Sequence, residues 1–281
     1  MLRKTLAMLA ALMLLVLVGC GGGPETPATS GGGAAPATPA ATPVAKKATA
    51  GAAAYDKAKS TGSIKGTITL DGKAPGRPQI NTGAEAKCAA MHTEPMLSET
   101  VVSKDGKLQN VIVYIKSGYD KFTYEPNTDA VTIDQKGCQY LPHVLALMVG
   151  QPLLVKNSDE LAHNIHGTSQ VQPFNEGQAH AGMEKKITFK EPEMGMRIQC
   201  DIHKWMGASA GVFEHPFYAV TDENGAFEIK NVPAGEYELA VWHESSDNKD
   251  KDENKLEGPA AVKVTVADKE VTQDFKYKVK E

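Results

Sequence analysis

The chain has 281 residues, with 30 Lys or Arg and 34 Asp or Glu, so its formal net charge is -4 near neutral pH. This balance provides no basic excess for binding nucleic acid, and no nucleic-acid partner is expected. Aromatic residues make up only 6% of the chain, whereas it contains 26 Gly and 16 Pro, which favours a β-rich protein with many turns.

The first 19 residues have the features of a lipoprotein signal peptide. A short positive start precedes an apolar run over residues 6–18, which is too short to cross a bilayer comfortably. The run ends in Leu17-Val18-Gly19-Cys20, which resembles a bacterial lipobox. The resemblance implies cleavage before Cys20, acylation of its thiol, and a membrane-anchored lipoprotein facing the periplasm or the cell surface. The alternative is an uncleaved signal anchor.

Residues 20–62 are dominated by Gly, Ala, Pro and Thr and carry almost no large apolar side chain. Such a segment cannot bury enough surface to offset the entropy lost on ordering. We therefore expect it to form a flexible tether between lipidated Cys20 and the globular part of the protein.

The remaining residues show many short strand patterns and one long irregular segment. Residues 74–98 are predicted to form a loop with room for a helical turn. The other segments alternate or are continuously apolar between turn residues, which is typical of an antiparallel all-β sandwich architecture. In chain order, the predicted strands cover 63–70, 108–115, 131–134, 144–149, 152–157, 185–189, 196–200, 208–213, 218–221, 226–229, 237–242, 262–266 and 271–277.

The chain contains four cysteines, and export would place them in an oxidising compartment. If Cys20 carries lipid and Cys200 binds a metal, Cys88 and Cys138 remain as a candidate disulfide. Their spacing alone does not establish the pairing. The alternative is a second metal site, whose members would be drawn from Cys88, His92, Cys138 and His143.

One short segment carries a concentrated set of metal ligands. A thiolate, an imidazole and a thioether occur at Cys-x2-His-x2-Met spacing in Cys200, His203 and Met206. A second imidazole, His163, follows the predicted strand 152–157. Two His, one Cys and a weak axial Met are the ligands of blue-copper electron-transfer sites, whereas zinc gains little from a thioether. The plain alternative is that Cys200 is a buried structural thiol.

Several motifs in the middle of the chain occur in a recognisable order. They are Val149-Gly150-Gln151, Val155-Lys156-Asn157-Ser158-Asp159, His163-Asn164, the set of Cys200, His203 and Met206, then Gly207 and Gly211-Val212. With these motifs, residues 129–214 resemble the cupredoxins, in particular plastocyanin and amicyanin. The short ligand loop matches amicyanin rather than plastocyanin. The resemblance implies an eight-stranded Greek-key sandwich with one type 1 copper ion at one end.

Carried over position by position, the resemblance assigns four ligands and one supporting residue. His163 would be the isolated ligand, Cys200 the thiolate, His203 the second imidazole and Met206 the axial thioether. Asn164 would tie the two ligand loops together through hydrogen bonds, which orients the ligands.

The chain also departs from the family near these ligands. Ile202 and Lys204 stand where relatives usually carry Pro, and Trp205 is bulkier than expected. His166 is an additional imidazole three residues after the preferred ligand His163. We expect His166 to be a surface or supporting residue rather than a metal ligand.

The flanking segments carry a second set of motifs. They are Gly66-Thr67-Ile68, Asp71-Gly72-Lys73-Ala74-Pro75, Thr221-Asp222-Glu223-Asn224-Gly225-Ala226-Phe227 and Pro233-Ala234-Gly235-Glu236-Tyr237. These resemble the carboxypeptidase regulatory-like, or transthyretin-like, β-sandwich, which is structural rather than catalytic. We predict that the copper domain, 129–214, is inserted between 63–128 and 215–281 of one host sandwich. The alternative is three consecutive modules.

The sequence therefore predicts a lipid-anchored copper protein that carries single electrons, and not an enzyme. His203 would be the electron port if its edge reaches the surface, with Trp205 and Ala208 as an apolar docking rim for an unidentified redox protein. The alternatives are copper storage or delivery and a metal-free surface-binding module. A copper enzyme would need an open coordination position, which Met206 opposes.

Overall fold

The computed structural model describes residues 51–247 and 255–280, which lie within one compact unit, Pro43–Glu281. The prediction of an all-β fold is confirmed, because nearly all regular structure in these residues is strand. The predicted signal peptide and the acylated Cys20 lie outside the described residues. None of the helices among the described residues has the length and apolar character needed to span a membrane.

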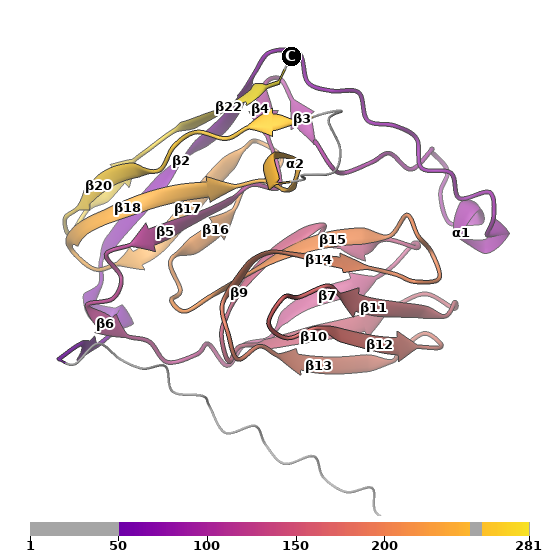
Figure 1. The fold of residues 1–281 in the computed structure, drawn as a ribbon, viewed down its shortest axis with the longest axis horizontal. Helices are drawn as coiled ribbons and strands as arrows, with labels where there is room; N and C mark the ends of the chain where they lie inside the picture. Colours follow the sequence, from indigo (N-terminus) through magenta and orange to yellow (C-terminus); the bar gives the residue numbers. More distant parts are fainter. Residues whose placement is uncertain (1–50, 248–254, 281) are drawn as a thin grey trace, which may run out of the picture. The chain divides into compact units, whose positions relative to one another are not determined.

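One group of strands comes from both ends of the described chain (Figure 1). One sheet has the order β16-β5-β18-β20, and another has the order β19-β22-β2-β4-β3, with β17 and β21 also pairing with β2. The bounds are β2 Gly62–Asp71, β3 Ser103–Lys104, β4 Lys107–Leu108, β5 Ile112–Ser117, β16 Tyr218–Val220, β17 Ala226–Val232, β18 Gly235–Trp242, β19 Leu256–Glu257, β20 Val262–Val266, β21 Glu270–Thr272 and β22 Phe275–Val279.

The side chains of these strands form one hydrophobic core. Alternate residues of β2, among them Ile64, Ile68 and Leu70, are buried, because successive side chains of a strand point to opposite faces. They pack with buried residues of the C-terminal strands, such as Phe227 and Tyr277. The core therefore joins segments that lie some 160 to 210 residues apart in the chain, and both ends contribute residues to it.

The second group of strands is continuous in sequence. Its sheets have the orders β13-β10-β7-β8 and β12-β11-β14-β15-β9, and their inner faces share a separate hydrophobic core. The bounds are β7 Val131–Gln135, β8 Tyr140–Leu141, β9 Val144–Met148, β10 Pro152–Asn157, β11 His163–Gly167, β12 Phe174–Gln178, β13 Glu184–Thr188, β14 Glu193–Gln199 and β15 Gly207–Phe213.

The chain leaves and re-enters the first group at neighbouring strands. β5 precedes the second group and β16 follows it, and these two strands pair antiparallel with Ala219 opposite Val113. An inserted domain needs its two ends close together, and this pairing brings them together. The division into a host sandwich and an inserted copper domain stays a prediction about independent folding units.

The last residues of the predicted tether, 20–62, belong to the fold, so the predicted boundary is wrong at its C-terminal end. The short strand β1 (Ala53–Ala54) pairs with β6 (Phe122–Thr123), and a 3-10 turn, η1, covers Lys57–Lys59. Tyr55 donates a hydrogen bond to the Asn231 carbonyl at 2.7 Å, and its ring packs edge-on against Phe217 with 5.4 Å between ring centroids. Tyr55 and the pairing of β1 with β6 thus anchor this segment, although its overall composition is that of a linker.

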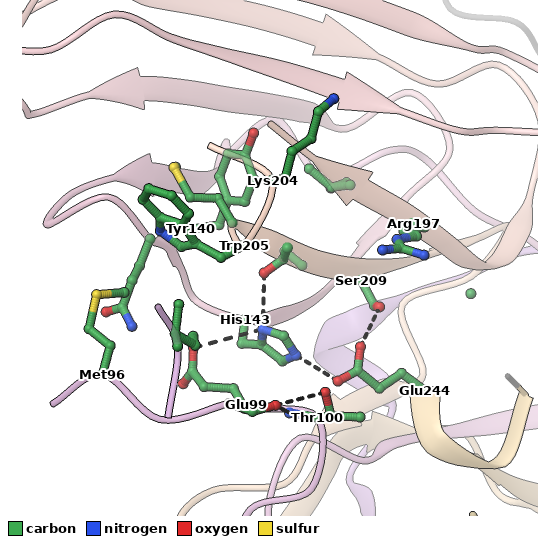
Figure 2. Close-up of a pocket in the computed structure, with 18 of the residues that line it drawn as sticks. Met96, Glu99, Thr100, Tyr140, His143, Arg197, Lys204, Trp205, Ser209 and Glu244 are labelled. Atoms are coloured by element: carbon green, nitrogen blue, oxygen red, sulfur yellow. Dashed lines mark hydrogen bonds and ion pairs between the residues drawn. The ribbon is translucent and has the colours of Figure 1, made fainter. Parts of the chain in front are cut away.

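A partly buried histidine connects the two groups of strands. His143, just before β9, forms a hydrogen bond of 2.7 Å to the carboxylate of Glu244, which begins the short helix α2 (Glu244–Asp247) (Figure 2). Its other ring nitrogen lies 3.1 Å from the Gly207 carbonyl and 3.8 Å from Glu99. Burial alone would lower the pKa of His143, but the hydrogen bond and charge of Glu244, with Glu99 and Gly207, outweigh it and raise the pKa above its usual 6.5.

A disulfide holds the long loop that precedes the second group. Cys88, in helix α1 (Ala86–Ala90), is bonded to Cys138, which follows β7. Both cysteines are fully buried, and the bond spans 50 positions of sequence. Because both sulfur atoms are used in this bond, neither is available as a thiolate for the alternative second metal site.

Replacing both Cys88 and Cys138 with Ala should lower the free energy of unfolding by about 4 kcal/mol, because a closed loop of this length restricts the unfolded chain. Urea unfolding of the oxidised protein measures the difference. Reduction with dithiothreitol should remove most of it. A difference that persists in full under reducing conditions would mean that the cross-link is not its source.

Glu244→Gln should weaken the link to His143 in a pH-dependent manner. Since the folded-state pKa of His143 is raised, its contribution is fully present below about pH 6.5 and is lost as the pH rises through the folded pKa. We expect the variant to be less stable by about 2 kcal/mol near pH 6, with a smaller difference near pH 9. Urea unfolding between pH 6 and pH 9 measures this difference in the free energy of unfolding. Glu228→Gln, at an exposed position, is the control. A difference that grows with pH would contradict the assignment.

Candidate metal centre

The strand pairing brings the predicted ligands to one edge of a sheet. β11 runs antiparallel to β14, with His166 opposite Gln199, so the start of β11 lies beside the end of β14. His163 is the first residue of β11, and Cys200 directly follows β14. Neighbouring strands β14 and β15 are joined by the seven-residue ligand loop 200–206, with Gln199 opposite Gly207. Residues 37 positions apart in sequence therefore meet at this edge.

Three of the four predicted ligands present their donor atoms to one point. The Nδ1 atoms of His163 and His203 lie 2.9 Å apart, and Cys200 Sγ lies 3.9 Å from His203 Nδ1. One donor atom from each of the three residues lies within 4.8 Å of the others, and all three residues are buried. This is the spacing of atoms that share a single ion at bond lengths of about 2.0 to 2.3 Å.

The orientation of His163 is fixed from its far side by a buried carboxylate. Its Nε2 lies 2.9 Å from Asp159 Oδ2. The same carboxylate accepts hydrogen bonds from the backbone N–H groups of Gly137 at 2.7 Å and Cys138 at 2.8 Å. With Nε2 bonded to Asp159, Nδ1 is the nitrogen left to face His203 and Cys200.

Asn164 joins the two ligand-bearing segments. Its Oδ1 accepts a hydrogen bond from the Asp201 N–H at 2.7 Å and lies 3.3 Å from Cys200 Sγ. Its amide group donates to the carboxylate of Asp201 at 3.0 Å and to Asn175 Oδ1 at 2.7 Å. One side chain on β11 thus sets the position of the thiol on the ligand loop.

Met206 closes the ligand loop. Its backbone N–H donates to the His203 carbonyl at 2.9 Å, and its carbonyl accepts from the Cys200 N–H at 3.2 Å. The residue is buried and belongs to the same hydrophobic core as Cys200. Its role as the axial ligand stays a prediction.

The electrostatics of the centre favour a thiolate. Burial raises the pKa of Cys200, but hydrogen bonding to His163 and to backbone N–H groups outweighs it, and the net pKa is lowered. Burial lowers the pKa of His163, yet its contacts with Cys200 and Asp159 raise it overall. For His203, burial and the nearby His163 both lower the pKa. The loop thiol therefore loses its proton readily, as a thiolate ligand must.

The other candidate residues have different partners. His166 bonds to the Asp201 carboxylate at 3.1 Å, and this contact, with help from Asn175, lowers the pKa of Asp201 to about 2. His92 Nε2 lies 2.7 Å from the Gly137 carbonyl. Neither belongs to a group of converging metal-binding side chains among the described residues.

Sequence reasoning missed the contribution of Asp159. The sequence places it only at the end of the motif 155–159, although it lies four residues before His163 and is buried. A buried carboxylate near a candidate ligand is a signal for a supporting role, because an unpaired buried charge is costly. The positions that bond to it, Gly137 and Cys138, carry no comparable signal in the sequence.

Two surface predictions need correction. Ala208 cannot form part of a docking rim, because it is only 3% exposed and lies within β15, a strand paired on both sides. His203 is only 4% exposed, so its edge does not form an open surface.

No protein-family model matches the chain. No curated protein matches it either. The solved structures that resemble it include copper proteins of the cupredoxin type, matched over about a third of the chain.

Three of these structures illustrate the likeness. Amicyanin from Paracoccus versutus is 19% identical, with 36% of this chain and 96% of that chain covered and a TM-score of 0.27. A purple cupredoxin from Nitrosopumilus maritimus is 24% identical over 30% of this chain and 99% of its own, with a TM-score of 0.26. The copper-containing nitrite reductase of Thermus scotoductus is 24% identical over 36% of this chain, with a TM-score of 0.29, and only 25% of its own length is covered.

Asp159→Ala should destabilise the protein, because it removes the acceptor of two backbone N–H groups and the partner of His163. We expect a loss of roughly 3 kcal/mol in the free energy of unfolding of the metal-free protein. The exposed Asp129→Ala should change it by less than about 0.5 kcal/mol. Equal effects of the two substitutions in urea unfolding would contradict this role of Asp159.

Proposed function

We propose that the chain is a blue copper protein that carries one electron at a time, with His163, Cys200, His203 and Met206 as ligands. The observation that carries this proposal is the convergence of His163 Nδ1, Cys200 Sγ and His203 Nδ1 on one buried point. One thiolate and two imidazoles are the strong ligands of such sites, and a thioether is the usual weak fourth ligand.

The residues present fit a copper ion better than zinc. The soft thiolate suits Cu(I), imidazole suits both oxidation states, and the nearby Met206 offers a soft sulfur. The carboxylate of Asp159, which lies beside the donor atoms, is already bonded to His163 and two backbone N–H groups. It therefore acts through His163 rather than as a ligand of its own. When bound, copper would supply one-electron redox chemistry.

The protein's contribution is to hold its donor atoms still. Asp159 fixes the ring of His163, and Asn164 fixes the start of the ligand loop. All three converging residues are buried, which excludes water from the space between them. A centre that keeps the same ligand positions in both oxidation states has little to rearrange when an electron arrives.

The remaining parts of the proposal concern location and partners. Acylation of Cys20 would anchor the protein to a membrane lipid, on the periplasmic side or at the cell surface. A redox protein or a small redox molecule would exchange electrons with the centre. The proposed role is that of a carrier and not an enzyme, because Met206 would fill the position that a substrate needs.

Addition of Cu(II) to the purified protein should produce an intense visible absorption band from thiolate-to-copper charge transfer, and Cys200→Ser should abolish it. His166→Ala is the matched control, because this histidine bonds to Asp201 rather than to the converging donor atoms, and it should retain the band. A redox titration should show one reversible electron.

Other results point to other functions. Tight copper binding without an intense band, together with ready release to chelators, would indicate storage or delivery. Failure to bind copper at all would overturn the proposal and favour a metal-free binding module.

A further inference from the structure

The imidazole of His203 is buried beside the disulfide. Both sulfur atoms of the Cys88–Cys138 disulfide lie within 4.8 Å of a ring nitrogen of His203. The two cysteines are fully buried, and so are the other two residues of the centre, His163 and Cys200. A redox partner therefore meets neither His203 nor the disulfide directly.

Trp205 provides a different connection to the surface. Its indole ring lies 5.2 Å from the His203 ring, measured between centroids, and its Nε1 donates to the Cys138 carbonyl at 3.1 Å. Of the aromatic rings and sulfur atoms that lie close to His203 among the described residues, only the indole of Trp205 is partly exposed; the others are buried. The indole thus reaches from the buried centre to solvent.

Trp205 also lines a pocket of about 340 Å³ (Figure 2). This volume is at the lower end of the range for small-molecule sites and suits a molecule with one aromatic ring. Met96 and the indole provide apolar surface, and the carboxylate of Glu99 provides a hydrogen-bond acceptor. Arg197 and Lys204 balance the negative charge of Glu99 and Glu244. The lining therefore favours a neutral aromatic molecule that donates hydrogen bonds.

We propose that Trp205 is the residue through which electrons enter the metal centre, and that the pocket binds a small aromatic reductant of the hydroquinone class. This inference rests on the proposed electron-carrier function. The aromatic ring of the reductant would lie against the indole, and one of its hydroxyl groups would donate to Glu99.

The proposed step conserves atoms and charge. One O–H bond of hydroquinone breaks, its proton goes to the Glu99 carboxylate, and one electron passes across Trp205 and His203 to the oxidised centre. Hydroquinone would be oxidised to its neutral radical, and a copper ion held by the centre would take up the electron, going from Cu(II) to Cu(I). Two such radicals then disproportionate to one quinone and one hydroquinone.

The test follows the loss of the visible band of the oxidised copper protein after rapid mixing with hydroquinone. The rate should saturate with hydroquinone concentration, and Trp205→Leu should lower the limiting rate on the order of tenfold. Trp205→Phe should keep most of it. Both replacements lose the indole hydrogen bond to Cys138, so the comparison isolates the aromatic ring.

Ile202→Ala is the control within the same loop, because Ile202 is 56% exposed and does not line the pocket. It should leave the rate unchanged. If Ile202→Ala slows reduction while Trp205→Leu does not, electrons enter over the exposed loop and the proposal is wrong. A rate that never saturates and is equal in wild type and Trp205→Leu would also overturn it, and would favour a protein partner.

A second measurement needs no metal. The chain contains only two Trp, so the indole N–H resonance of Trp205 can be assigned by its loss in Trp205→Phe. Titration of the metal-free protein with hydroquinone should shift this resonance saturably, and no shift would contradict the pocket. Absence of the visible band in wild type would sink the proposed function instead, so the two failures are distinguishable.

Discussion

The candidate metal centre depends on one buried contact, the hydrogen bond between Asp159 and the Nε2 atom of His163. The carboxylate is held by two backbone N–H groups of the turn at Gly137 and Cys138. This arrangement leaves Nδ1 of His163 facing the ligand loop. A short chain of hydrogen bonds thus runs from the turn after β7 to the first ligand, and each polar partner in it is satisfied.

The disulfide contributes to this arrangement in two ways. It restrains the long loop that contains α1, and it joins that loop to Cys138, whose N–H bonds to Asp159. Its sulfur atoms also lie beside His203 and exclude solvent from that imidazole. The same cross-link therefore supports one histidine through hydrogen bonds and covers the other. A consequence is that the contact surface of the centre lies elsewhere, at a side chain that is both near His203 and partly exposed.

The first group of strands has a physical connection to the centre. Glu244 bonds to His143, and His143 bonds to the carbonyl of Gly207, the residue after Met206. Ser209, on β15, also donates to Glu244. These contacts place a carboxylate from the C-terminal part of the chain against the strand that leaves the ligand loop. The position of that strand therefore depends on packing contributed by both ends of the described chain.

The sequence by itself determined the strand-rich class, because alternating apolar residues in segments such as 63–70 and 152–157 can bury only one face of a sheet. It also determined the ligand types, since a thiolate, an imidazole and a thioether within seven residues are a local property of the chain. Tertiary structure alone decided the anchoring of Tyr55, the contact of Asp159 with Cys138, and the covering of His203. Each of these joins residues distant in sequence, and their meeting depends on strand pairing and loop packing that no local pattern encodes.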